Sequence, residues 1–351
     1  MGLSEIRKSI DLLDSEILKL LNHRMELVLM AKRFKDTIQD SQREKEVLSM
    51  IRMNSTDLIS PEFIETLYRE IIKESRKVQE NAYALIAFQG EHGAYGEVAS
   101  KAWDGTLIPI PCKEFREVFE GVESGLYDYG IVPVENTLGG AVSQVNQLLI
   151  NTDLCVVGAV ELPIHLCLLA LPGSDHRDIR SVYSHPQALS QCRRFLARNK
   201  LEPLEWTDTA GAAKMLAEKK PKRAAAIASK LSARLCNLEI IKENVQDLES
   251  NLTRFLVLAK EENKGQGHKC SIRFCTEHKA GALFSALEVF AKRHMNLTRI
   301  ESIPNEPGNY AFFLDFEGSN KEDRVAEALE EVKSMTTDFK LMGCYRERKI
   351  R

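Results

Sequence analysis

The first 82 residues contain almost nothing that ends a helix. Gly2 and Pro61 are their only glycine and proline, and apolar residues recur at helical spacing over residues 6–35. The pattern predicts one very long helix there, a second over 41–53 and a third over 60–79, where serine followed by proline is typical of a helix start. Three such helices cannot enclose a core by themselves. The apolar stripe therefore predicts a partner chain.

Composition excludes several classes of protein. A chain of 351 residues has room for two or three domains. Its 48 basic and 51 acidic side chains give a net charge of −3, so bulk charge gives no reason to expect nucleic-acid binding. The longest apolar run, 166–171, is far shorter than the ~20 residues of a membrane span, and the N-terminal residues form no apolar signal core. We therefore expect a cytoplasmic protein that binds neither nucleic acid nor membrane.

The eight cysteines of the chain are scattered, and none forms a C-x-x-C pair. In a protein without a secretion signal, such cysteines are expected to be reduced thiols, mostly buried as small apolar side chains.

The chain changes character at Tyr83. From there to about Lys260, short apolar strands alternate with helices, which predicts an α/β domain. The expected strands are 84–88, 129–134, 154–160, 165–171, 224–228 and 254–259, and the expected helices are 115–124, 187–198, 209–218 and 229–235. Residues 158–163 are the expected crossover between two lobes. After a polar linker over 261–269, a βαββαβ order over 271–345 predicts a ferredoxin-like domain.

Polar side chains lie along the helical segment where apolar ones would be expected. Arg7 and Arg24 are 17 residues apart on one helix, about 25 Å, so they cannot hold one small ligand within a single subunit. An antiparallel partner could bring its Arg7 to this Arg24, and Lys35, three turns further on, shares a face with Arg24. The other polar residues of this set are Asp40, Arg43, Glu44, Ser75 and Gln79. Each alone is also compatible with solvated surface charge.

Together these eight residues resemble the all-helical class of chorismate mutase, over nearly all of residues 1–82. The resemblance implies a three-helix domain that forms an intertwined dimer and rearranges chorismate without a metal or nucleophile. It implies that Arg7 of the partner, Arg24 and Arg43 grip carboxylates. Lys35 and Gln79 would bond the ether oxygen, and Glu44 would hold the ring hydroxyl.

Four motifs stand out in the α/β segment. They are Gly90-Glu-His-Gly-Ala-Tyr-Gly, Val132-Pro-Val-Glu-Asn-Thr-Leu-Gly-Gly, Tyr183-Ser-His-Pro-Gln and Asn251-Leu-Thr-Arg-Phe. A glycine loop after a strand lets its backbone approach an anion. Each motif alone is weak, because Ser-His-Pro-Gln also fits an ordinary helix start and Thr253 also fits a strand.

In order and spacing, these motifs resemble the prephenate dehydratase family over residues 84–260. The whole chain is thus similar to bifunctional chorismate mutase–prephenate dehydratases. The resemblance implies a two-lobed α/β domain like type II periplasmic binding proteins, with a site in the cleft that needs no cofactor. It implies that Thr253 helps to protonate the departing ring hydroxyl. The other implied substrate-binding residues are Glu135, Asn136, Thr137, Ser184, His185, Thr209, Arg254 and Phe255.

Some details depart from that pattern. Gly96 stands where a serine usually follows the tyrosine of the first loop. Ala-Phe-Gln-Gly, Leu-Gly-Gly and Asp208-Thr-Ala-Gly-Ala-Ala look closer to plant arogenate dehydratases. Arogenate is therefore the alternative second substrate.

The C-terminal segment resembles an ACT domain through Gly281-Ala282-Leu283, at a strand-to-helix turn where a ligand carboxylate could approach. The implied ligand is phenylalanine as feedback inhibitor. The implied effector residues are Gly281, Ala282, Leu283, Asn296, Leu297, Glu301 and Ser302. Ile303 replaces the arginine that usually follows Glu-Ser.

A metal site is an alternative for part of the same segment. His268, Cys270, Cys275 and His278 cluster in sequence, but the two cysteines are an odd number of residues apart. On one strand they point to opposite faces, so we expect no metal.

The resulting hypothesis is a cytoplasmic enzyme of phenylalanine biosynthesis, acting on chorismate and then prephenate. Its expected domains are 1–82, 83–262 and 269–351, and it is expected to form a homodimer or homotetramer. A non-catalytic amino-acid-binding regulator is the alternative from another class, since binding-protein-like lobes and an ACT domain fit it as well.

Overall fold

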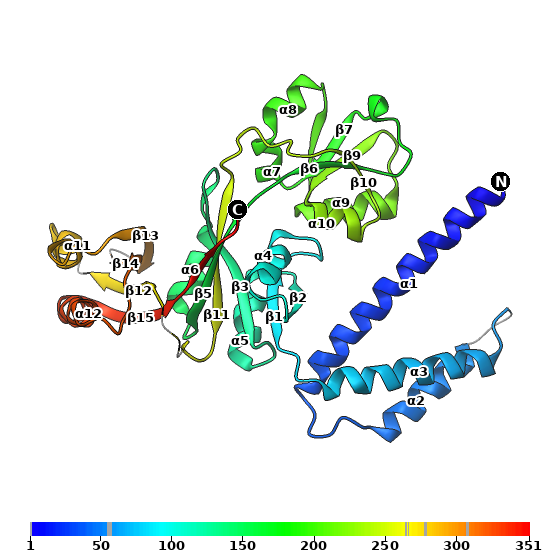
Figure 1. Ribbon diagram of the computed structural model, residues 1–351, viewed down its shortest axis with the longest axis horizontal. Helices are drawn as coiled ribbons and strands as arrows, with labels where there is room; N and C mark the ends of the chain where they lie inside the picture. Colours follow the sequence, from blue (N-terminus) through cyan, green and yellow to red (C-terminus); the bar gives the residue numbers. More distant parts are fainter. Residues whose placement is uncertain (1, 55–57, 264, 266, 277–278, 307–308) are drawn as a thin grey trace. The chain divides into compact units, whose positions relative to one another are not determined.

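The computed structural model describes residues 2–54, 58–263, 265, 267–276, 279–306 and 309–351. The chain forms two compact units, Met1–Ala84 and Leu85–Arg351, which are described separately (Figure 1). Within the described residues, no helix combines the length and apolar character needed to cross a bilayer.

The first unit consists of three helices. They are α1 (Leu3–Lys32), α2 (Ser41–Asn54) and α3 (Pro61–Glu80). The predicted start of α3 is confirmed, because the Ser60 side chain accepts a hydrogen bond from the backbone N–H of Phe63 at 3.2 Å. The prediction that α1 runs to Lys35 is wrong by three residues. Its last turn tightens at Arg33, whose N–H bonds to the carbonyl of Met30.

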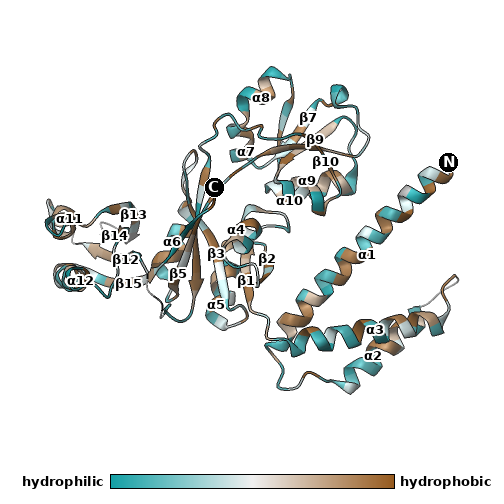
Figure 2. Ribbon diagram, in the orientation of Figure 1, coloured by the Kyte–Doolittle hydropathy of each residue, from teal (hydrophilic) through white to brown (hydrophobic). Residues whose placement is uncertain are grey.

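The N-terminal half of α1 makes no packed core within its unit. Leu3, Ile6, Ile10, Leu13 and Ile17 are between 44% and 65% exposed, and Figure 2 shows apolar patches along this helix. Among the described residues, the hydrogen bonds that join α1 to α3 and its C-cap Asn81 involve the C-terminal half of α1. They run from Arg24 to Ser75, from Ser75 to the sulfur of Met25, from Gln79 to the carbonyl of Val28 and from Lys32 to the carbonyl of Asn81.

The second unit begins with a two-lobed α/β arrangement (Figure 1). The first lobe is a sheet in the order β16-β5-β11-β3-β1-β2, with β4 paired to β3, and β16 (Glu347–Lys349) comes from the end of the chain. Its elements are β1 (Leu85–Gln89), α4 (Tyr95–Trp103), β2 (Ile108–Cys112), α5 (Phe115–Ser124), β3 (Tyr129–Asn136), β4 (Gly140–Ala141), α6 (Ser143–Asn151), β5 (Cys155–Pro163) and β11 (Leu252–Ala259).

The second lobe is a sheet in the order β10-β6-β9-β7-β8. Its elements are β6 (Cys167–Ala170), β7 (Ser181–Ser184), α7 (Pro186–Gln191), α8 (Arg193–Arg198), β8 (Glu202–Glu205), α9 (Thr209–Lys219), β9 (Ala224–Ala228), α10 (Lys230–Leu235) and β10 (Glu239–Lys242). The chain enters this lobe after β5 and returns into β11. The crossover expected at 158–163 is thus the end of β5.

The lobes contain more elements than expected, because strands β2, β4, β7, β8 and β10 and helices α4 and α6 were not among the predicted ones. The helix expected over 187–198 is divided into α7 and α8, because Cys192 has a non-helical backbone (φ −114°, ψ 18°). Strand β2 was not expected, since its sequence Ile-Pro-Ile-Pro-Cys contains two prolines. Proline is tolerated there because β2 is an edge strand that pairs only with β1.

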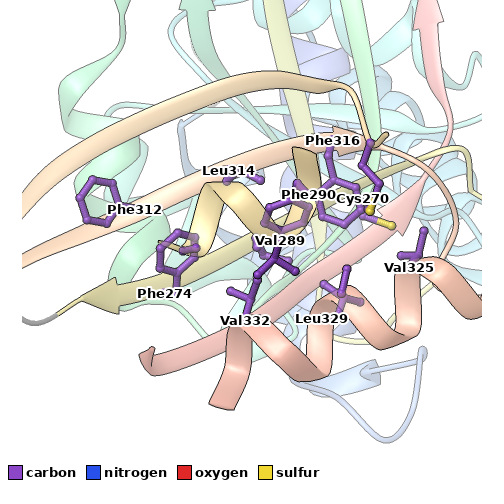
Figure 3. Close-up of a cluster of buried hydrophobic side chains, with 14 of the residues drawn as sticks. Cys270, Phe274, Val289, Phe290, Phe312, Leu314, Phe316, Val325, Leu329 and Val332 are labelled. Carbon is purple, nitrogen blue, oxygen red and sulfur yellow. The ribbon is translucent and has the colours of Figure 1, made fainter. Parts of the chain in front are cut away.

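The C-terminal domain has the expected βαββαβ order. Its elements are β12 (Lys269–Thr276), α11 (Ala282–Lys292), β13 (Leu297–Glu306), β14 (Asn309–Glu317), α12 (Asp323–Met335) and β15 (Thr337–Tyr345), and its strand order is β13-β14-β12-β15. Figure 3 shows Val289 and Phe290 of α11 and Val332 of α12 meeting Phe274 and Phe316 of the sheet. Both helices therefore cover one face of this sheet.

The expectation that all eight cysteines are reduced is wrong for one pair. Cys270 and Cys344 are register partners on β12 and β15, with Cα atoms 4.3 Å apart, and a disulfide joins them. Adjacent antiparallel strands bring the Cβ atoms of such partners close together. The pairing could not be predicted from the sequence, because the two cysteines are 74 residues apart. Cys112, Cys155, Cys167 and Cys192 are buried free thiols.

The C-terminal domain is anchored to the first lobe by its last strands. After β15, the segment β16 (Glu347–Lys349) pairs in parallel with β5, so the chain's C-terminal residues extend the first-lobe sheet. Gly343 of β15 lies directly against β5, where an added Cβ would be 2.1 Å from the carbonyl oxygen of Val156. Neither contact was expected from the sequence.

We predict that Gly343→Ala weakens this anchoring. The obstacle is β5 backbone, which cannot move aside cheaply, so we expect a loss of about 2–3 kcal/mol in stability. The measurement is the midpoint of urea unfolding followed by tryptophan fluorescence. Gly105→Ala is the matched control, because the nearest atom to its added Cβ is 3.8 Å away. Equal midpoints for the two variants would contradict the prediction.

Candidate active sites

The helical unit contains a cavity of about 210 Å³. Seven of the eight sequence-predicted residues line it: Arg24, Lys35, Asp40, Arg43, Glu44, Ser75 and Gln79. The three cations among these seven residues fit a ligand with more than one carboxylate. Arg7, the eighth, does not line it, because it lies almost five turns before Arg24 on the same helix.

Side chains inside the cavity hold one another in place. Arg24 donates a hydrogen bond to Ser75, and the Gln79 amide nitrogen donates to the carbonyl oxygen of Val28 at 2.8 Å. The Asp40 carboxylate accepts from the backbone N–H of Arg43 at 2.9 Å, at the start of α2. Ser75 and Gln79 are both 6% exposed. These two buried side chains of α3 therefore hold α3 against α1 through hydrogen bonds.

Arg76 is a cavity residue that the sequence analysis missed. Its Nε donates to Glu44 Oε1 at 2.8 Å, and its Nη2 bonds the other carboxylate oxygen. This fork fixes the Glu44 carboxylate at the cavity wall. The available signal was the helical spacing of Arg76 and Gln79, three residues apart, which places both on the face of α3 that carries Ser75.

The second unit contains a cavity of about 450 Å³ between its two lobes. The first lobe contributes the Gly90–Gly96 loop, Asn136, Thr253 and Phe255, and the second contributes His185 and Thr209. Five of the nine residues predicted for this site thus line one cleft: Asn136, His185, Thr209, Thr253 and Phe255.

Thr253 and Asn136 form the best-defined polar pair in this cleft. They are register partners on β11 and β3, and the Asn136 amide nitrogen lies 2.9 Å from Thr253 Oγ1. The Asn136 Oδ1 accepts from the backbone N–H groups of Leu138 and Gly139 at 3.0 and 2.8 Å. That arrangement identifies the amide nitrogen as the donor. Thr253 Oγ1 is therefore an acceptor from Asn136, and its own hydroxyl proton can be donated to a ligand.

His185 enters the cleft as the N-cap of α7. Its Nδ1 accepts from the backbone N–H of Gln187 at 3.2 Å. Burial lowers the pKa of His185, against the opposing effect of Asp208 and Glu205. The ring is accordingly neutral at pH 7 and carries its proton on Nε2, where it can be donated.

The Gly90–Gly96 loop is held by a buried carboxylate. Glu97 Oε2 accepts from the backbone N–H of Gly93 at 2.8 Å and contacts His92 Nδ1 at 3.2 Å, while Lys101 donates to Oε1 at 2.5 Å. Burial acts to raise the pKa of Glu97, but hydrogen bonds from His92, Lys101 and Gly93 lower it to about 2. Glu97 therefore stabilises the loop as a carboxylate.

Four predicted residues lie outside the cleft. Ser184 is fully buried and donates to the carbonyl of Ile227 at 2.6 Å, and Thr137 donates to the carbonyl of Ser250 at 2.7 Å. Glu135 and Arg254 are neighbours of Asn136 and Thr253 on the same strands, so their side chains point to the opposite face. The expectation that Arg254 holds a substrate carboxylate is wrong, because Asp315, Glu347 and Tyr345 bind its guanidinium.

Arg254 does not line the cleft. Among the described residues, no other arginine or lysine lines it either. Anionic groups must then meet backbone N–H groups, amides and hydroxyls. The first residues of α4 and α9, Tyr95 and Thr209, line the cavity, and helix N-termini favour anions. Gln187, Gln191 and Asp208 also line it and were missed. The signal for Asp208 was its position as the N-cap of α9.

Comparison with known proteins agrees with these sites. The sequence matches the chorismate mutase type II family over residues 6–80, the prephenate dehydratase family over 86–263 and the ACT domain family over 271–334. A bifunctional chorismate mutase/prephenate dehydratase of Aquifex aeolicus is 37% identical, covering 98% of this chain and 97% of that one. The chain belongs to the bifunctional chorismate mutase/prephenate dehydratase family.

Two further relatives cover the second unit. An arogenate dehydratase/prephenate dehydratase of Arabidopsis thaliana is 38% identical, over 77% of this chain and 75% of that one. The structure of prephenate dehydratase from Arthrobacter aurescens in complex with L-Phe is 28% identical with a TM-score of 0.70, over 75% of this chain and 90% of that one. Members of this family have both catalytic domains, so the alternative hypothesis of a non-catalytic regulator is not supported.

The predicted effector residues of the ACT domain lie on two elements. Gly281, with a positive φ of 86°, is the N-cap of α11, and Ala282 and Leu283 form its first turn. Leu297, Glu301 and Ser302 lie on β13, directly after Asn296. Ile303 is 6% exposed and packs in one cluster with Ile150 of α6. It thus joins the effector strand to the dehydratase domain.

The cysteines of the alternative metal site face different clusters. Cys270 lies in the ACT core, and Cys275 lies with Ile150 and Ile303. His278 lies outside the described residues. Among those described, no group of three His, Cys, Asp or Glu side chains is arranged to hold a metal ion.

We predict that Glu97→Gln destabilises the dehydratase domain most at neutral pH. The pKa of Glu97 is lowered from 4.5 to about 2 on folding, so its ionised form contributes about 3 kcal/mol above pH 4.5 that is lost as pH falls toward 2. Urea unfolding at about pH 7 and about pH 4 should show a smaller difference between variant and wild type at the lower pH. A difference independent of pH would contradict this assignment.

Proposed function

We propose that this chain carries both steps at the residues described above. Its domains are 1–82 for chorismate mutase, 83–262 for prephenate dehydratase and 269–351 for the ACT domain. The helical cavity rearranges chorismate to prephenate, and the cleft converts prephenate to phenylpyruvate. Phenylalanine bound at the ACT domain inhibits the pathway, and the enzyme acts in the cytoplasm. The observation that carries the second step is the Thr253–Asn136 pair in the cleft lining, in which Asn136 donates to Thr253 Oγ1 and the Thr253 hydroxyl remains able to donate to a ligand.

In the mutase cavity, catalysis requires that the protein hold chorismate in its reactive conformer and stabilise the charge that develops as the bond breaks. Arg24 and Arg43 hold the carboxylates of chorismate, which favours its reactive diaxial conformer. Lys35 and Gln79 donate to the ether oxygen, where negative charge develops as the C–O bond breaks. Glu44, fixed by Arg76, accepts from the ring hydroxyl. Ser75 orients Arg24, and Asp40 orients the first turn of α2.

The mutase cavity is completed by a second copy of the chain. Arg7 is too far along α1 to reach the cavity of its own subunit, and the apolar stripe of the same half of α1 is exposed. An antiparallel α1 from a second copy covers that stripe and places its Arg7 at Arg24. The chain is therefore a homodimer at this domain, and association of ACT domains would extend it to a tetramer.

We predict complementation between two inactive mutase variants. Arg7→Ala and Arg24→Ala should each lose mutase turnover by at least about a hundredfold, because a carboxylate loses its partner. When the two are unfolded and refolded together, each heterodimer regains one intact site. Random pairing then restores about a quarter of wild-type activity. Mutase assays of the separate and mixed variants check this, and a mixture as inactive as its parts would overturn the dimer.

In the dehydratase cleft, Thr253 assists the departure of the ring hydroxyl. The C–O bond breaks and the Thr253 hydroxyl passes a proton to the leaving oxygen, which departs as water. The bond to the ring carboxylate breaks at the same time, and its electron pair completes the aromatic ring. Carbon dioxide is released, and no cofactor is consumed. Solvent water returns a proton to Thr253 Oγ1, so the reaction takes up one proton from solvent overall. Neutral His185 supports the departing oxygen or a carboxylate through Nε2–H.

Arogenate is the second candidate substrate for the cleft. It carries an ammonium group, and the acidic Asp208 lines the cavity. The Asp208 carboxylate is engaged by the backbone N–H of Gly211 at 2.7 Å, which reduces its capacity to bind an ammonium. Prephenate is also the product of the first domain, so the chain supplies it.

We predict that Thr253→Val separates the two activities. With chorismate as the only substrate, wild type should convert it to phenylpyruvate with little prephenate remaining. The variant should accumulate prephenate, with dehydratase turnover reduced by at least about a hundredfold and mutase turnover unchanged. Thr253→Ser, which keeps the hydroxyl, is the matched control.

The same time course has three further outcomes. Prephenate that accumulates with wild type, while added arogenate is converted to phenylalanine, would make arogenate the substrate. Full dehydratase turnover in Thr253→Val would overturn the role of Thr253. Unchanged chorismate with wild type would overturn the first step.

A further inference from the structure

The strand pair that carries Thr253 has two functional faces. Thr253 and Asn136 are register partners that line the cleft, and the next pair in the register is Arg254 with Glu135. Because successive side chains of a strand point to opposite faces, Arg254 projects away from the cleft between two residues, Thr253 and Phe255, that line it. A displacement of Arg254 along β11 therefore moves Thr253.

The three side-chain hydrogen bonds of Arg254 go to residues that follow the dehydratase domain, and Glu135 of β3 adds an ion pair at 3.6 Å. Nε donates to Glu347 at 2.6 Å, Nη1 to Asp315 at 2.5 Å and Nη2 to the hydroxyl of Tyr345 at 3.0 Å. The Arg254 side chain is 5% exposed. Burial alone would lower the pKa of Arg254, but Asp315, Tyr345 and Glu347 raise it. Arg254 is thus a permanent cation held at three points by β14, β15 and β16.

Three cations and three carboxylates form a largely buried cluster that includes Arg254, so their charges balance. Arg254, Arg299 and Lys269 face Asp315, Glu347 and Glu135. Burial acts to raise the pKa of Asp315, but Arg254 and Arg299 lower it. Removing one member from such a buried cluster leaves another charge unpaired, which is costly. The cluster therefore resists independent movement of β11 and the ACT sheet.

A second contact joins the same elements. Arg299 of β13 donates to Asn146 of α6 at 2.7 Å, and α6 also carries Gln144, which lines the cleft. Arg299 lies two residues before Glu301, on the strand that carries the proposed phenylalanine residues. One strand of the ACT domain is therefore connected to the cleft through α6 and, by way of Asp315, through Arg254.

We propose that Arg254 is a positioning residue for Thr253, and that the ACT sheet sets the position of Thr253 through the bonds of Arg254 to Asp315, Tyr345 and Glu347. The inference rests on the proposed role of Thr253. Rearrangement of the ACT sheet shifts β11 and removes the Thr253 hydroxyl from the leaving oxygen. Inhibition then acts on turnover, because Arg254 itself does not touch the substrate.

Tyr345→Phe and Glu347→Gln test this with small changes. The first removes one hydroxyl that bonds both Arg254 and Ser271, and the second removes one charge. Measured in the full chain with prephenate, each should lower dehydratase kcat by up to about tenfold with KM unchanged. Each should also raise the fraction of activity that remains at saturating phenylalanine. Arg254→Lys should act in the same direction, because lysine cannot make the three-point contact.

Asp338→Asn is the matched control. It neutralises another ion pair of the same sheet, with Arg273 at 3.0 Å, at a position with φ 49° that asparagine accepts. Its kcat and its residual activity under phenylalanine should equal those of wild type. Mutase turnover of every variant, measured on the same sample, gives the amount of intact chain.

Two results would overturn the proposal. One is wild-type kcat and wild-type inhibition in both Tyr345→Phe and Glu347→Gln. The other is a lower kcat with an unchanged fraction of activity at saturating phenylalanine, which is the result of a merely structural role. Failure of the proposed function is recognised separately, by full dehydratase turnover in Thr253→Val.

Discussion

The antiparallel pairing of β11 with both β3 and β5 is the constraint on which the second unit depends. β11 is the strand by which the chain returns from the second lobe, so its pairing closes the path between the lobes and forms the cleft. The register of that pairing places Thr253 beside Asn136. It also places Arg254 where three side chains of β14, β15 and β16 can bind it. One strand thus joins the cleft, the two lobes and the ACT domain.

Much of the fold could be predicted from local patterns. The three helices of the first unit and the βαββαβ order of the ACT domain follow from periodicity, and the start of α3 follows from Ser60 and Pro61. Strand β2 and the interruption at Cys192 could not be predicted. The first depends on being at a sheet edge, and the second on a backbone angle that residue identity does not determine.

The mutase site was more predictable than the dehydratase site for a physical reason. Helical spacing relates sequence to direction over many turns, so seven of eight predicted side chains reach one cavity. On strands, direction reverses at every residue. The motif Asn251-Leu-Thr-Arg-Phe predicted Thr253 and Phe255 for the site, and both line the cleft. It could not show that Arg254, between them, binds a neighbouring domain, because that domain's carboxylates come from residues 315 and 347.

The parallel pairing of β16 with β5 has a consequence for how the protein is made. During synthesis, residues 155–163 leave the ribosome long before residues 347–349. Until then β5 is an open edge strand, with unpaired backbone groups that can template aggregation. The helical domain is complete early and can associate, whereas the dehydratase sheet stays unfinished until the ACT domain has been synthesised. The C-terminal segment that follows the ACT strands therefore also covers the open edge of the catalytic sheet once synthesis is complete.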